Sequence, residues 1–146
     1  VDIKFNNKIL HQSKLVKYFS EESVSKKKIE KDLNNYLKKI KKSKKNYLIT
    51  KDIILIEAMV SDGIEIKEEF KNLYDSKENT IPTDIQILIN DQEIGMAILR
   101  LVEIIGQDKI KDLGSETLYF LINALNQMDI DPIRNEILYN VLPLRA

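Results

Sequence analysis

Apolar side chains recur at helical spacing along most of the chain, and this pattern predicts an all-α protein. Most candidate helices begin at a Ser, Thr, Asn or Asp that can cap a helix N-terminus, and several end near a glycine. Sustained alternation of apolar and polar residues is absent; residues 85–89 could be read as a strand, but one strand has nothing to pair with. The predicted helices cover residues 7–19, 25–43, 50–61 and 66–74, a segment beginning at Thr83, and residues 90–106, 115–128 and 131–142. We therefore expect about eight or nine mostly short helices, packed as antiparallel hairpins in an α-solenoid-like stack or an irregular orthogonal bundle.

Three segments are apolar on nearly every side of the helix that they would form: residues 52–60, 94–105 and 116–128. A helix without a polar face has to be surrounded by other helices. We therefore predict that these three form the core, and that the amphipathic residues 66–74 and 133–142 cover it.

The length of 146 residues suits one helical domain covering residues 1–146. Ser, Asn, Thr and Pro gather in residues 75–82, which we interpret as a linker between two sub-lobes, residues 1–75 and 83–146. Because the first residue is Val1 rather than Met, we expect the domain to be part of a longer chain. No apolar run approaches the roughly 20 residues that span a bilayer, so the sequence predicts no transmembrane segment.

A weak internal repeat links "EAMVSDGIEIKEEF", "VEIIGQDKIKDLG" and "NQMDIDPIRNEIL", each with an apolar helix end, an acidic or glycine turn, an isoleucine and a new helix. These units loosely resemble the hairpins of tetratricopeptide-like α-solenoids. A fixed period of about 34 residues and the signature Trp, Gly and Pro positions are missing, so the resemblance implies architecture only. Residues 95–146 look similar to the C-terminal part of uncharacterised helical proteins of alphaproteobacteria, some of them exported, which implies a bacterial origin.

The chain has no cysteine, and this excludes disulfides, thiolate metal sites and cysteine nucleophiles. His11 is the single histidine, so neither a usual zinc cluster nor a Cys–His pair can form, and we predict a structural or exposed role for it. Phosphate-binding glycine loops are absent as well, and no metal or other cofactor is predicted. The composition, with 20 Lys against 3 Arg, is typical of an AT-rich bacterial genome and leaves open whether the protein is cytoplasmic or exported to the periplasm.

The net charge of zero hides a division along the chain. Residues 1–51 hold 15 lysines and 5 acids, whereas residues 52–146 hold 8 basic residues and 18 acids. Such an asymmetry affects association rather than fold, and it suggests that two copies could associate head to tail through their oppositely charged halves.

Lysines also gather on one side of the predicted helix at residues 27–45. The ridge lies opposite the apolar side of the helix, within about 60° on a helical projection. It is either a solvated face with a favourable helix C-terminus or a binding site for an anionic partner. The lack of arginine and of interleaved aromatics argues against nucleic acid. The ridge consists of Lys27, Lys31, Lys38, Lys42 and Lys45.

Glu57 is the one carboxylate inside an otherwise apolar segment, and a carboxylate in apolar surroundings can act as a general acid. Lysozyme-like transglycosylases place a catalytic Glu at the end of such a helix, but here Ala58 stands where they have serine and no G-L-M-Q follows. We therefore expect Glu57 to pair with a lysine or with Arg100, and Arg100 to pair with Glu93 or Glu103.

Taken together, these patterns predict a non-enzymatic helical interaction or scaffold module that binds another protein through a surface groove or a charged face. The first alternative is a binder of nucleic acid or an anionic surface that uses the ridge at Lys27–Lys45. The second alternative is a cell-wall hydrolase or transglycosylase that uses Glu57.

Overall fold

The computed structural model describes residues 4–20, 24–43, 47–75 and 81–143. These residues form six α-helices, four short 3-10 segments and no strand, which confirms the all-α prediction. The α-helices are α1 (Lys26–Lys42), α2 (Thr50–Ser61), α3 (Thr83–Asn90), α4 (Ile94–Ile105), α5 (Ser115–Gln127) and α6 (Asp131–Val141). The 3-10 segments are η1 (Leu10–Gln12), η2 (Lys14–Phe19), η3 (Glu68–Leu73) and η4 (Ile110–Asp112).

Local side-chain hydrogen bonds set several helix boundaries. Ser25 caps α1 as predicted, because its hydroxyl accepts a bond from the Lys28 N–H at 3.4 Å. The predicted helix at residues 7–19 instead divides into η1 and η2 at Ser13. The Ser13 hydroxyl donates to the Leu10 carbonyl at 2.7 Å and accepts from the Leu15 N–H at 3.3 Å, so it ends one turn and begins the next.

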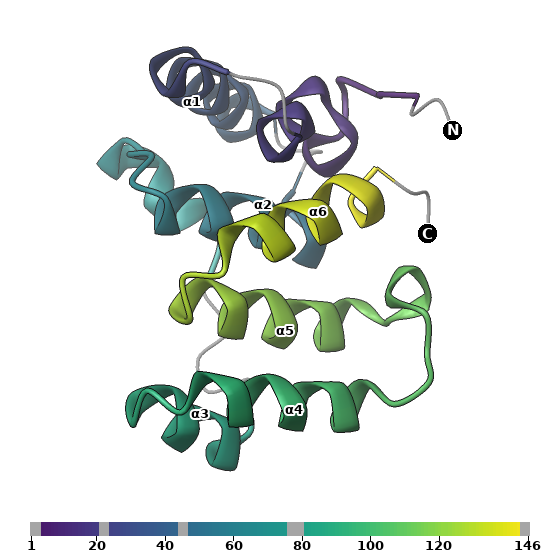
Figure 1. The fold of residues 1–146 in the computed structure, drawn as a ribbon. Helices are drawn as coiled ribbons and strands as arrows, with labels where there is room; N and C mark the ends of the chain where they lie inside the picture. Colours follow the sequence, from purple (N-terminus) through teal and green to yellow (C-terminus); the bar gives the residue numbers. More distant parts are fainter. Residues whose placement is uncertain (1–3, 21–23, 44–46, 76–80, 144–146) are drawn as a thin grey trace.

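The helices stack in layers (Figure 1). One end of the stack holds α1, η1 and η2, and the opposite end holds the pair α3 and α4. Between them lie α2 and α6, followed by α5. Helix α2 packs on α5, α6 packs on both α5 and η2, and α3 packs mainly on α4.

A single hydrophobic cluster runs through the stack and takes residues from both predicted sub-lobes, from Leu10 to Leu142. Its centre is α2 and α5, which are buried along most of their length, as predicted from their apolar sequences. Residues 76–80 of the predicted linker lie outside the described part of the chain. Every helix among the described residues is too short or too polar to cross a lipid bilayer.

Helix α4 differs from its prediction as a surrounded core helix. Only Ala97 and Leu101 are buried, whereas Met96, Leu99 and Val102 are 55 %, 59 % and 58 % exposed. The reason is position: α4 lies in the end layer, so it packs on one side and no described helix covers its outer side.

Candidate functional site: a lysine-lined groove

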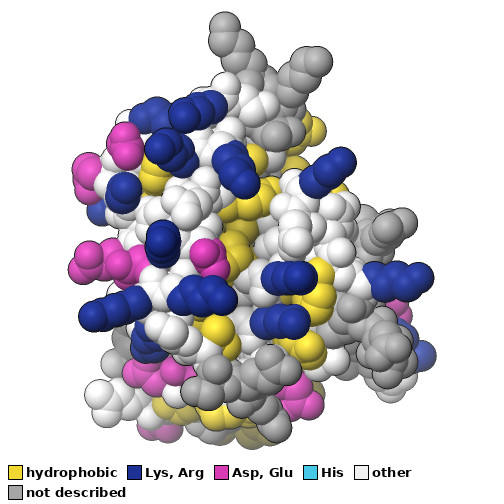
Figure 2. All heavy atoms as spheres, turned by 90° about the horizontal axis from the view of Figure 1, so that it is seen from above, with side chains coloured by type: hydrophobic (Ala, Val, Ile, Leu, Met, Phe, Trp, Pro, Cys, Tyr) yellow, Lys and Arg dark blue, Asp and Glu magenta, His cyan; other side chains and the backbone are white. Residues whose placement is uncertain are grey.

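The predicted ridge lies on the outer side of α1. Lys27, Lys31, Lys38 and Lys42 are all exposed to solvent, whereas Lys45 lies outside the described residues. The opposite side of α1 is buried, so the helix has the two faces that its sequence predicted. Figure 2 shows the stack from this end, where lysines are spread over the face and hydrophobic side chains are visible between them.

Beside the ridge, a groove of about 490 Å³ lies between α1 and η2. This volume falls within the roughly 300–1,000 Å³ of typical ligand clefts. Lysines line it from both sides: Lys14 and Lys17 come from η2, and Lys28 and Lys39 come from α1. Among the described lining residues Asp32 is the only acidic one, so these residues together carry a net positive charge.

Apolar side chains line the same groove between the lysines. They are Leu15, Val24, Ile29 and Tyr36, and all of them also belong to the hydrophobic cluster or pack against it. The groove therefore combines positive charge with apolar surface, a combination that suits an acidic ligand with its own apolar side chains.

Two features of the sequence position the groove. Lys28, Asp32, Asn35 and Lys39 follow one another at spacings of four, three and four residues, which puts them on one side of α1. Tyr36 on α1 connects this helix to the segment before η1, because its hydroxyl donates a hydrogen bond to the backbone carbonyl of Lys8 at 2.9 Å. Burial and then the negative charge of a nearby aspartate raise the pKa of Tyr36, so this hydroxyl stays a hydrogen-bond donor at neutral pH.

The groove and the predicted ridge use different lysines of α1. Lys28 and Lys39 face η2 and are not members of the predicted ridge. Their spacing of eleven residues, three helical turns, was a signal that they share a side. The sequence did not show that η2, with Lys14 and Lys17, would pack beside that side.

His11 lies in a buried contact between η1 and the start of α2. Its Nδ1 is 2.7 Å from Asp52 Oδ1, and its backbone N–H donates to the same oxygen at 3.0 Å. The other carboxylate oxygen of Asp52 accepts the N–H of Ile49 at 3.0 Å. Asp52 therefore caps α2, a role that the sequence suggested for Thr50, and anchors η1 at the same time.

Glu57 lies on α2 and faces α5. Its Oε2 accepts a hydrogen bond from the Tyr119 hydroxyl at 2.7 Å, and its Oε1 is buried with no hydrogen-bond partner in the described structure. The expectation that Glu57 pairs with a lysine or with Arg100 is wrong for the described residues. Arg100 is in the end layer on α4, where it bonds to Asp84 at 2.6 Å and to Glu103 at 3.1 Å, the second of which was predicted.

Comparisons of the chain with protein-family models, with curated proteins and with solved structures gave no match.

Proposed function

We propose that this protein is a non-enzymatic helical interaction module that binds an acidic protein segment in the lysine-lined groove. The observation that carries the proposal is the groove itself, in which four lysines surround apolar side chains in a space of about 490 Å³. Stacked helices, as in the tetratricopeptide-like solenoids that the sequence loosely resembles, form rigid surfaces of this kind.

Each part of the groove has a separate physical role in the proposal. The lysine ammonium groups carry compact charges on flexible stems, so they attract an acidic segment over a distance and accelerate its association. The apolar lining contributes affinity after contact, because apolar area on both partners leaves water. The ligand that fits is a protein segment with Glu or Asp interleaved with Leu or Ile.

A direct test uses a fluorescent synthetic helix of Glu and Leu at helical spacing, followed by fluorescence anisotropy. We expect binding that weakens as salt rises. The double variant Lys28→Glu/Lys39→Glu should bind at least about tenfold more weakly, because it reverses two charges in the groove.

The matched control is Lys67→Glu/Lys71→Glu, which changes the net charge equally but lies at η3, outside the groove. It should bind the peptide nearly as well as the parent. Equal weakening by both variants would mean that only net charge matters, and absence of binding at low salt would overturn the proposal.

Nucleic acid or an anionic surface is the alternative ligand, and the exposure of the four described ridge lysines favours it. A single-stranded oligo(dT) serves as the probe. Binding that falls steeply with salt and is lost in Lys27→Gln/Lys31→Gln/Lys38→Gln/Lys42→Gln would support this alternative. Binding of the acidic helix in the same ridge variant would support the groove.

The second alternative, a cell-wall hydrolase using Glu57, is supported by the buried, unpaired Glu57 Oε1. The test is turnover of purified peptidoglycan. Activity that Glu57→Gln abolishes, with the fold retained, would replace the proposal of a non-enzymatic module.

A further inference from the structure

Helix α4 presents an apolar strip on the outside of the end layer. Met96, Leu99 and Val102 follow one another at spacings of three residues, so they form one continuous row, and each is more than half exposed. The adjacent helix α3 adds Ile87, which is 54 % exposed. A row of this kind on the outside of a folded domain is typical of a surface that binds another protein.

The charges around this strip are mostly negative. The described segment of α3, the α3–α4 turn and α4 has one basic residue, Arg100, and four acidic residues, namely Asp84, Asp91, Glu93 and Glu103. Arg100 is already bonded to Asp84 and Glu103 within the same chain. The outer face of α4 is therefore an apolar helix face with acidic borders, which is the kind of ligand that the groove was proposed to accept.

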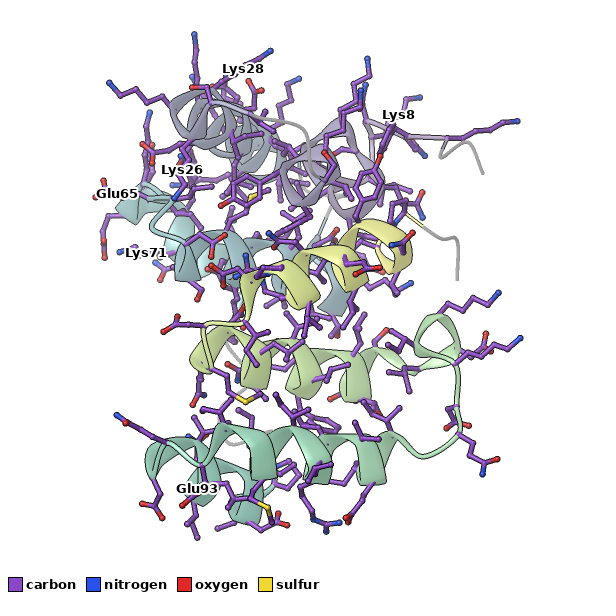
Figure 3. The ribbon with its side chains drawn as sticks, viewed as in Figure 1. Lys8, Lys26, Lys28, Glu65, Lys71 and Glu93 are labelled. Atoms are coloured by element: carbon purple, nitrogen blue, oxygen red, sulfur yellow. The ribbon has the colours of Figure 1, made fainter. Side chains whose placement is uncertain are left out.

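The two surfaces lie at opposite ends of the molecule. In Figure 3, Lys28, which lines the groove, lies at one end of the stack, and Glu93, at the start of α4, lies at the other end. One chain cannot bring them together, but two copies stacked end to end can.

We propose that the outer face of α4 in one copy docks in the lysine-lined groove of a second copy. The inference rests on the proposed function, since it names the acidic segment that the groove binds. In this arrangement the apolar lining of the groove contacts Met96, Leu99 and Val102. The lysines of the groove pair with Glu93 and Glu103. Both surfaces thereby lose exposed apolar area, and opposite charges face each other.

The charges also disfavour the simpler symmetric dimer. Two α4 faces packed against each other would place acidic borders against acidic borders, and like charges that face each other across an interface disfavour binding. Docking of α4 into the groove is heterologous instead, so a pair keeps one unused groove on one copy and one unused α4 face on the other. Further copies add at both ends, which yields open chains rather than a closed dimer.

The first experiment measures the weight-average mass by sedimentation equilibrium from micromolar to millimolar protein. We expect the mass to rise above that of one chain with concentration. The association constant should fall at least about tenfold between about 10 mM and about 1 M NaCl, where the screening length shrinks from about 30 Å to about 3 Å. A mass that stays at one chain at every concentration in low salt would overturn the inference.

The decisive experiment mixes two variants that each lack one face. Lys28→Glu/Lys39→Glu removes the charge of the groove, and Leu99→Asp disrupts the row on α4. Each alone should stay monomeric, whereas an equimolar mixture should form a 1:1 dimer and nothing larger, because one intact groove meets one intact α4 face. A groove variant that still self-associates like the parent, or a mixture that stays monomeric, would overturn the inference.

Ile133→Asp is the matched control, since Ile133 is half exposed but lies on α6, away from both surfaces. It should associate like the parent. Far-UV circular dichroism and urea unfolding verify the fold of every variant, and Leu99→Gln replaces Leu99→Asp should the charged variant not fold. Peptide binding in the groove without self-association would retain the proposed function and reject only the choice of a second copy as partner.

Discussion

Arg134 on α6 forms a bidentate ion pair with Asp62 at the end of α2. Arg134 Nη1 lies 2.8 Å from Asp62 Oδ1, and Nη2 lies 2.6 Å from Oδ2. The arginine is completely buried, and its Nη1 also donates to the side chain of Asn126 at 3.1 Å. The Tyr18 hydroxyl donates to the same Asp62 carboxylate at 2.6 Å. One buried charge pair therefore joins η2, α2, the end of α5 and α6.

Arg134→Met should destabilise the protein strongly. Removing one partner leaves the Asp62 carboxylate partly buried without its cation, which typically costs about 3–5 kcal/mol. The control is Arg100→Met, since Arg100 also pairs with an aspartate but is exposed, and an exposed pair of this kind contributes little to stability. Urea denaturation measures the free energy of unfolding of both variants. Equal losses of stability in the two variants would contradict the central role of Arg134.

The Asp62 pair should also make the stability depend on acid pH. Burial alone would raise the pKa of Asp62, but hydrogen bonds from Arg134 and Tyr18 and the guanidinium charge lower it below its ordinary value of 3.8. The unfolded chain, with the ordinary pKa, takes up the proton first as pH falls, so acid favours unfolding.

The difference in unfolding free energy between the parent and Asp62→Asn should therefore be constant above about pH 5. It should shrink as the pH falls through the ordinary and then the lowered pKa of Asp62. Urea titrations at a series of pH values measure this free-energy difference. A difference that grows toward acid pH would contradict the lowered pKa of Asp62 in the folded protein.

Asp52→Asn should destabilise the junction of η1 and α2. The amide keeps the shape of the carboxylate, but its NH2 group faces an N–H donor of either Ile49 or His11, so one buried donor loses its acceptor. We expect a loss of about 1–3 kcal/mol in urea denaturation. Asp112→Asn, at an exposed position in η4, is the control and should change little.

Alanine at two glycines should have opposite effects. Gly95 is helical, and a Cβ atom there meets nothing within 4 Å, so Gly95→Ala should stabilise α4 by about 0.5 kcal/mol. Gly63 has φ of +94° at the end of α2, so Gly63→Ala should cost about 1 kcal/mol. Thermal unfolding of both variants checks the signs, and two changes of the same sign would contradict this account.

The sequence by itself determined the local structure. The Ser25 cap, the apolar bodies of α2 and α5 and the division of α1 into a buried and a lysine side were all predicted correctly. Each depends on residues within a few positions of one another, and backbone hydrogen bonding and side-chain periodicity act over that range.

Only the tertiary structure decided which charges pair over long distances in the chain and that the outer face of α4 is exposed. Arg134 and Asp62 are 72 residues apart, and His11 and Asp52 are 41 apart, so neither pair has a signal in local spacing. The apolar sequence of α4 predicted burial, but its place in the end layer left its outer face exposed. The groove likewise exists because η2 packs beside α1, and helical periodicity describes the sides of each helix without specifying its neighbour.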